Sequence, residues 1–468
     1  MKSSLLLSLA AVLLLSGCSM APKLEVPAPV LPESTSEANT TVSIDVKWWE
    51  QFGDARLNTL IGEALANNDD LKLAMSNVAL ARASLGLSEA ERYPTVNAAA
   101  SAYRQKTSGE SLSPFAGFIY NSFGLSASVA YEFDFWGKYK NSEEAAWAEL
   151  LASEADKETV RITLISSVAE LYFNLITLQQ QIQVTDETVN AYRESYEYRH
   201  RQYDHGVIDA LTLEQAHALY ANAKLTLASL KETKIVTESA LAILLGHSPK
   251  AIFDDRIGVE ARLPQPLNIP ANMASNLLQQ RPDIRSAEER LRAANAVIGV
   301  AKAAYFPSIS LTGSAGVQST ELSTLMRSSA GMWGFGPSLN VPLLDFGRIK
   351  NSVKSAEAQK DAAVITYGKT VKNAFKEVYD ILNKIEISRD KLTAQNEETE
   401  ALKKVLTLSE KRFDSGYGTY LDVVAAKRAL LNSRTNRIAL NAELVINQVT
   451  LYKALGGGWK ADDGLQKQ

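Results

Sequence analysis

Residues 123–138 read FGLSASVAYEFDFWGK, and this stretch joins two different patterns. From Phe123 to Phe135, apolar side chains occupy the odd positions and small or polar side chains occupy the even positions. Alternation with a period of two predicts a β-strand that has one apolar and one polar face. From Lys138 onward, no proline or glycine occurs before Gly206. This absence predicts one uninterrupted helix of roughly 100 Å.

The same order of patterns recurs in the second half of the chain. Several short segments repeat at a constant offset of 210 residues: Trp136-Gly137-Lys138 with Phe346-Gly347-Arg348, Gln202–Gly206 with Arg412–Gly416, and Leu245-Gly246 with Leu455-Gly456. Upstream, Asp70-Leu71 matches Asp283-Ile284 and Tyr93-Pro94 matches Phe306-Pro307, both at an offset of 213. A register this constant indicates a duplicated unit, and the three-residue change falls where a loop is expected.

Each unit reads as helix, strand, loop, strand, very long helix, tight turn and long helix. The predicted helices are 70–92, 138–204 and 209–246, then 283–305, 348–414 and 419–456, with short helices near 54–67 and 271–280. The predicted strands are 95–107, 121–135, 307–318 and 332–343. The predicted organisation is a signal peptide (1–17), an anchored extended segment (18–53), repeat 1 (54–248), a proline-rich linker (249–270), repeat 2 (271–458) and a tail (459–468).

The small, polar faces of the strands and the aromatic residues at the strand ends favour a water-filled membrane barrel. A half-buried sheet in a soluble domain is the other interpretation of the alternation. In a membrane, four strands per chain cannot close, because open edges would leave N–H and C=O groups unsatisfied in lipid. Two chains would supply eight strands and three would supply twelve. We therefore expect an oligomer, in which the long helices also pack on their neighbours.

The N-terminus has the features of a bacterial lipoprotein. Lys2 precedes an apolar run, and Leu15-Ser16-Gly17-Cys18 resembles a lipobox, in which the cysteine is acylated and becomes the new N-terminus. An ordinary cleaved signal with an incidental cysteine is the alternative. Cys18 is the only cysteine, and Ser19 after it favours the outer membrane by resemblance. The net charge of −4 offers no electrostatic footprint for nucleic acid.

The chain from Cys18 to Gly458 resembles the TolC/OprM-like outer membrane factors. The resemblance is carried by the duplication, the lipobox, the junctions Asp134–Lys138 and Leu344–Arg348, and the segment Arg281-Pro282-Asp283-Ile284. It implies a mainly α-helical chain with a membrane β-barrel, and a homotrimer with a twelve-stranded barrel and a periplasmic helical barrel. The implied partners are a periplasmic adaptor (a membrane fusion protein), an inner-membrane RND-type pump and lipid of the outer membrane.

The resemblance implies a passive exit duct of a tripartite efflux pump that carries drugs or other small toxic compounds. A duct for type I protein secretion and a periplasmic coiled-coil adaptor or scaffold remain alternatives. We expect no enzyme, cofactor or metal site, because catalytic motifs such as GxSxG, the P-loop and GxGxxG are absent. The four histidines, His200, His205, His217 and His247, lack metal-ligand spacing, and we expect them on helix surfaces.

The turns that end the two longest helices are the predicted periplasmic gate. Gly206 and Gly416 lie where a helix commonly closes with a left-handed residue. Thr419 and Asp422 have capping-box spacing, so Asp422 stabilises the helix start. The resemblance implies a second role for Asp422, in an acidic ring that binds cations across the closed pore. Asp209, at the equivalent turn of the first unit, completes this group.

The tip also departs from the family pattern. A second acid, present one turn on in some relatives, is Ala425 here. The tyrosine and arginine that lock the closed tip in some relatives correspond to Phe413 and Gly418. We therefore expect a single carboxylate ring of weaker cation affinity rather than the lock.

Overall fold

The structure is a computed structural model, and it describes residues 19–26, 45–110, 117–254, 262–264, 266 and 281–459. These residues fall in two compact units, and each unit draws on both sequence repeats. The first unit takes residues 1–28, 77–154 and 286–368, and the second takes 29–76, 155–285 and 369–468. The compact units therefore differ from the repeats, because each of the two longest helices contributes residues to both units.

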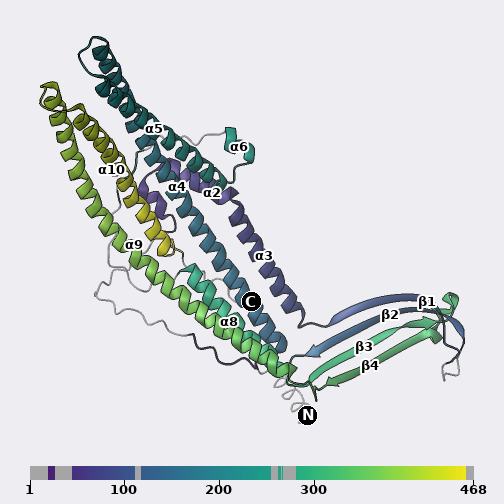
Figure 1. The fold of residues 1–468 in the computed structure, drawn as a ribbon. Helices are drawn as coiled ribbons and strands as arrows, with labels where there is room; N and C mark the ends of the chain where they lie inside the picture. The colour runs from purple at the N-terminus through teal and green to yellow at the C-terminus, as the bar shows by residue number, and fades with distance from the viewer. Residues whose placement is uncertain are drawn as a thin grey trace. The chain divides into compact units, whose positions relative to one another are not determined.

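The described elements follow the order expected from the sequence (Figure 1). They are η1 (Trp48–Phe52), α2 (Ala55–Asn67), α3 (Asp69–Ala90), β1 (Thr95–Lys106), β2 (Ile119–Phe133), α4 (Lys138–Asp204), α5 (Ala210–Leu244), α6 (Pro249–Asp254), α8 (Pro282–Ala303), β3 (Ser308–Ser319), η2 (Leu322–Thr324), η3 (Ser328–Ala330), β4 (Gly331–Asn340), α9 (Arg348–Asp414) and α10 (Tyr420–Ala454).

The duplication is visible in the element bounds themselves. Adding 213 to the bounds of α3 and β1 yields those of α8 and β3. Adding 210 to the bounds of α4 and α5 yields those of α9 and α10. The predicted long helices and the four strands are thus confirmed to within a few residues, whereas the short helix expected near 271–280 lies outside the described residues.

Two connecting segments contain short helical elements that the sequence pattern did not indicate. The region expected to be an extended N-terminal segment contains the turn η1, because Trp48, Trp49 and Phe52 are buried there. The expected linker begins with the short helix α6. His247 was also expected on a helix surface, but its Nε2 lies 2.8 Å from the Glu63 carboxylate and its side chain is largely buried.

The core of the second unit is built around η1 and the middle of α4. The Trp48 ring stacks on Tyr452 of α10 with centroids 4.8 Å apart, and Phe52 packs against Phe173 of α4. Asp54 caps α2 through two main-chain N–H groups and also accepts a hydrogen bond from the Tyr172 hydroxyl at 2.7 Å. These contacts join three sequence regions into one apolar cluster.

Among the described residues, α4 is the one helix long and apolar enough to cross a membrane. Most of its apolar window is buried inside the protein. The buried apolar residues of α4 between Leu164 and Ile176 belong to the core cluster of the second unit. The apolar window is therefore explained by core packing.

In the first unit, the segment after Ser19 is held against the helices α4 and α8. The Ser19 hydroxyl donates to Asn141 Oδ1 at 2.7 Å, and Asn295 Nδ2 donates to the Pro22 carbonyl oxygen at 2.9 Å. Gly299 leaves the room for this approach, because a Cβ at this position would lie within 3 Å of both Asn141 and Ala21. Residues 19–22 are thus hydrogen-bonded to α4 and α8.

Candidate functional site

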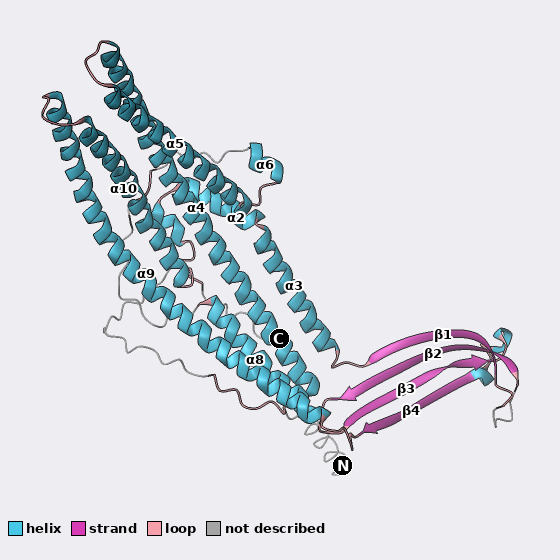
Figure 2. Cartoon of the chain, in the orientation of Figure 1, coloured by secondary structure: helices cyan, strands magenta, loops and turns pink. Residues whose placement is uncertain are grey.

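The strands β1, β2, β3 and β4 lie side by side in that order in one antiparallel sheet (Figure 2). The pairing register sorts their side chains into one polar and one apolar face. Paired residues share a face of the sheet. Across the four strands, the polar face includes Asn97, Ser128, Ser314 and Gly334, which pair in that order. The opposite face includes Val96, Val129, Gly313 and Phe335, which also pair in order. The predicted alternation therefore extends across the whole sheet.

The apolar face of the sheet is exposed in the single chain. Trp333 is 84% exposed, Phe335 70% and Leu339 64%. Exposed apolar surface of this extent marks a partner or a membrane. A sheet with one apolar and one polar face suits a position between lipid and water.

Both edges of the sheet are open. β1 pairs only with β2, and β4 pairs only with β3, among the residues that the structure describes. Each edge therefore carries a row of main-chain N–H and C=O groups that require partners if the sheet lies in lipid.

The junction from β2 to α4 is tied to the start of β3. The indole Nε1 of Trp136 donates to the Pro307 carbonyl oxygen at 2.7 Å, and its ring stacks on Phe306 with centroids 4.6 Å apart. The Asp134 carboxylate accepts a hydrogen bond from the main-chain N–H of Lys140. At the second junction, the Asp345 carboxylate accepts from the main-chain N–H groups of Gly347 and Ile349, which lowers the pKa of Asp345.

The turn between α4 and α5 has the predicted conformation. Gly206 has a φ of 68°, the left-handed region expected for a helix-closing glycine. Asp209 is the N-cap of α5 and accepts from the main-chain N–H of Thr212 at 2.9 Å. Hydrogen bonding to the Thr212 side chain, together with the bond from the Thr212 main-chain N–H, lowers the pKa of Asp209, so the carboxylate is the favoured form at the tip.

The turn between α9 and α10 also follows the prediction. Gly416 has a φ of 76°, and Thr419 and Asp422 form the predicted capping box. The Thr419 main-chain N–H donates to Asp422 Oδ2 at 3.2 Å, and the Asp422 N–H donates to the Thr419 hydroxyl at 3.3 Å. The structural role of Asp422 is thus confirmed. At Gly418, a Cβ would lie 3.2 Å from Cβ of Arg412, so a larger residue would crowd this turn.

Phe413 takes part in a contact that sequence reasoning missed. The guanidinium of Arg199, from α4, lies over the Phe413 ring at 4.7 Å and over the Tyr420 ring at 5.1 Å. Phe413 and Tyr420 also contact each other, with centroids 5.3 Å apart. Cation–π contacts therefore connect α4, of the first repeat, to α9 and α10, of the second repeat. No local pattern around Arg199 indicates its distant partners.

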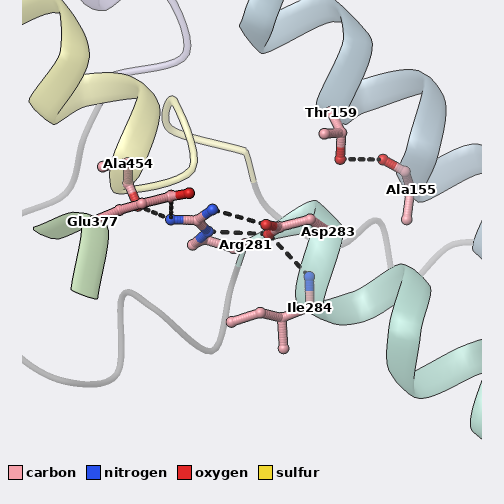
Figure 3. A network of polar contacts seen from close by, with 7 residues as sticks. All are labelled: Ala155, Thr159, Arg281, Asp283, Ile284, Glu377 and Ala454. Atoms are coloured by element: carbon pink, nitrogen blue, oxygen red, sulfur yellow. Dashed lines mark hydrogen bonds and ion pairs between the residues drawn. The ribbon is translucent and has the colours of Figure 1, made fainter. Parts of the chain in front are cut away.

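A network of polar contacts around Arg281 lies where α8 begins and α10 ends (Figure 3). Arg281 is buried, and its guanidinium donates to both carboxylate oxygens of Asp283 at 3.0 and 2.7 Å. It also donates to the Ala454 carbonyl oxygen and forms an ion pair with Glu377 at 2.8 Å. The segment that carried the resemblance at 281–284 thus has a structural role.

Comparison with known proteins identifies the fold. A family model described as "Outer membrane efflux protein" matches the chain in two segments, residues 60–247 and 273–457. The chain belongs to the outer membrane efflux protein family. The two matched segments correspond to the two sequence repeats of this outer membrane efflux protein.

Curated relatives and solved structures agree. The cation efflux system protein CusC of Escherichia coli K12 is 36% identical over 459 residues, covering 97% of this chain and 99% of the relative. The toluene efflux pump outer membrane protein TtgC of Pseudomonas putida is 33% identical over 477 residues, covering 100% of this chain and 98% of the relative. The Campylobacter jejuni CmeC outer membrane channel superposes with a TM-score of 0.90 at 29% identity, covering 95% and 96% of the two chains.

These findings establish the class and the location of this outer membrane efflux protein. It is an exit channel of the outer membrane that extends into the periplasm, and its family is one of channels rather than enzymes. The alternatives of protein secretion and of a periplasmic scaffold are not favoured. The apolar face of the sheet is the face that lipid can cover, and the polar face is the one that water can fill.

Proposed function

We propose that three copies of the chain pool their strands into one twelve-stranded barrel that surrounds a water-filled passage. The supporting observation is the four-stranded sheet, which combines one polar face, one exposed apolar face and two open edges. Closure removes the edges, because each edge finds its hydrogen-bonding partner on a neighbouring chain. Twelve strands enclose a wider lumen than eight, which suits a duct for whole solute molecules.

In this proposal the protein acts as the passive outer section of a tripartite pump. A periplasmic adaptor and an inner-membrane pump deliver the cargo and supply the energy, while the channel supplies a continuous aqueous path. The cargo class is drugs or other small toxic compounds. The names of the relatives support a broad class, because they refer to cations for CusC and to toluene for TtgC, and the two relatives have similar identity to this chain.

The oligomer can be tested directly. Mass photometry of the detergent-solubilised protein should give about three times the mass of one mature chain. The chain of 468 residues, before the signal peptide is removed, has a mass of 51.0 kDa. In planar bilayers the same preparation should conduct ions. A folded monomer that retains its strand content would contradict the proposal, because two open edges cannot remain in lipid.

We further propose that acylated Cys18 anchors the chain. Cys18 itself lies outside the described residues, but Ser19, the next residue, is hydrogen-bonded to Asn141 near the start of α4. The relative SilC of Salmonella typhimurium, 34% identical, is named a probable outer membrane lipoprotein. Acyl chains on one residue can hold a protein at a membrane surface.

At the helix tips, we propose that the Asp422 carboxylates of three chains form one acidic ring that binds cations. Asp422 is exposed, so its capping role does not bury its charge. Gly206, Gly416 and Gly418 shape the two turns, and Asp209 adds a carboxylate at the first. Phe413 contributes an aromatic surface for Arg199 instead of the lock found in some relatives.

A further inference from the structure

We infer the residue-by-residue register of the barrel seam, in which β4 of one subunit pairs with β1 of the next. In this register Asn340 lies opposite Ala99 of the partner subunit, and Leu339 lies opposite Ala100 of the partner subunit. The inference rests on the proposed trimer, which supplies the neighbouring edge but says nothing about which residues pair.

The first step is that the repeat relationship reproduces a strand register within the chain. The repeat moves Thr95 to Ser308 by 213 residues and Ala130 to Asn340 by 210. Thr95 pairs with Ala130 in β1 and β2, and Ser308 pairs with Asn340 in β3 and β4. The repeat therefore converts one observed hairpin register into the other without any shift.

The second step applies the same relationship to the pairing between the units. β2 of the first repeat pairs with β3 of the second, and Ala130 lies opposite Thr312. Advancing Ala130 by 210 gives Asn340, and moving Thr312 back by 213 gives residue 99. In every pair between β2 and β3 the two residue numbers add up to 442. At the seam, the residue number in β4 and the residue number in β1 of the partner subunit therefore add up to 439.

The chemistry of the facing residues agrees with this register. Ser338 meets Ser101 of the partner subunit on the polar face, and Leu339 meets Ala100 of the partner subunit on the apolar face. A shift of one residue would place apolar residues of one strand on the polar face of its neighbour. Near the ends of the two strands, Trp333 lies opposite Lys106 of the partner subunit, a pairing that permits a cation–π contact.

The junction beside the seam follows the same rule. Trp136 stacks on Phe306 within one chain, and the repeat equivalents of these residues are Phe346 and Tyr93. Phe346 is 86% exposed and Tyr93 is 70% exposed. Phe346 should therefore stack on Tyr93 of the partner subunit. Phenylalanine lacks the indole N–H, so the hydrogen bond that Trp136 makes to Pro307 has no equivalent there.

Cysteine cross-linking tests the register, and the chain offers a suitable background because Cys18 is its only cysteine. The two test variants are Ala99→Cys with Asn340→Cys and Ala100→Cys with Leu339→Cys. Neighbouring pairs of an antiparallel ladder alternate between wide and narrow Cα spacing, so these two variants sample both. The matched controls are Ala99→Cys with Ser338→Cys and Ser101→Cys with Asn340→Cys, which keep the same face but shift the register by two residues.

After mild oxidation of outer membranes, at least one test variant should form covalent trimers at least ten times faster than either control. Directly opposed Cβ atoms lie about 4.5–5.5 Å apart, whereas diagonal neighbours lie at about 7–8 Å. If a test variant fails to insert, Ser101→Cys with Ser338→Cys probes the same register.

Faster cross-linking in a control, or none in any variant of a protein that mass photometry shows to be trimeric, would overturn the register and leave the trimer standing. A monomer by mass photometry would overturn the trimer and the register together. The two failures are therefore distinguishable.

Discussion

The guanidinium Nη1 of Arg281 donates a hydrogen bond to the carbonyl oxygen of Ala454 at 2.7 Å, between residues 173 positions apart in the sequence. Ala454 is the last residue of α10, where carbonyl groups have no partner within the helix. A cation at this end of a helix also interacts favourably with the helix dipole. Arg281 therefore caps the C-terminus of α10, while the carboxylates of Asp283 and Glu377 neutralise the charge of its guanidinium.

Replacing Arg281 should destabilise the folded chain. Arg281→Met removes the hydrogen bonds to Asp283 and to the carbonyl oxygen of the buried residue Ala454. Loss of these charge-assisted hydrogen bonds should lower the free energy of unfolding by about 1.5–3 kcal/mol. Denaturant unfolding of the detergent-solubilised protein measures this change. Arg327→Met is the control, because Arg327 is exposed. Equal losses in the two variants would show that the Arg281 network is not stabilising.

Charges on the two faces of the sheet should have opposite consequences. Leu125→Arg places a cation on the apolar face, where an arginine at the bilayer midplane costs about 2–4 kcal/mol, so insertion should fall. Ser126→Arg, one residue away on the polar face, should insert and change the single-channel conductance instead. Heat-modifiable migration of outer-membrane fractions and bilayer recordings report the two effects. Normal insertion of Leu125→Arg would mean that this face does not meet lipid.

Loss of the acylation site should affect sorting more than folding. Mass spectrometry of the mature wild-type N-terminus should find acylated Cys18, and Cys18→Ser should reduce the amount of protein in the outer-membrane fraction. The remaining protein should keep its secondary structure by circular dichroism, because the hydrogen bond from Ser19 to Asn141 does not involve Cys18. An unmodified N-terminus that begins at another residue would contradict this prediction.

Asp422 should influence both stability and cation block. Asp422→Asn removes the charge near the N-terminus of α10, which should lower stability by about 0.3–1 kcal/mol. It should also raise the concentration of divalent cation needed to block conductance in planar bilayers. Asp422→Glu keeps the charge and should retain most of the block. If Asp422→Asn lowers thermal stability and leaves the block unchanged, Asp422 is only a helix cap.

The sequence predicted the features that depend on local patterns. The C-terminal ends of α4 and α9 could be predicted because each helix ends two residues before a left-handed glycine, Gly206 or Gly416. The faces of β2 could be predicted because alternation is local to the strand. The capping box of Thr419 and Asp422 was predictable for the same reason.

Contacts between distant residues could not be predicted in this way. Trp48 stacks on Tyr452, and Arg199 lies over Phe413, although nothing in the intervening sequence links the members of each pair. His247 was expected to be exposed. Its position at the end of a helix does not indicate that the Glu63 carboxylate lies beside it. The partners of such residues depend on how the helices pack, and packing is a property of the whole chain.

The identity of the two hairpin registers has a consequence for how such a channel assembles. A hypothetical half-length chain would carry two strands, so twelve strands would require six molecules and five successive associations. Joining the halves reduces this to three molecules and two associations. Each association costs translational and rotational freedom, so the tandem chain lowers the entropic barrier to assembly. It also lets the two halves differ: Trp136 donates a hydrogen bond at its junction, whereas Phe346, at the equivalent junction, has no N–H to donate.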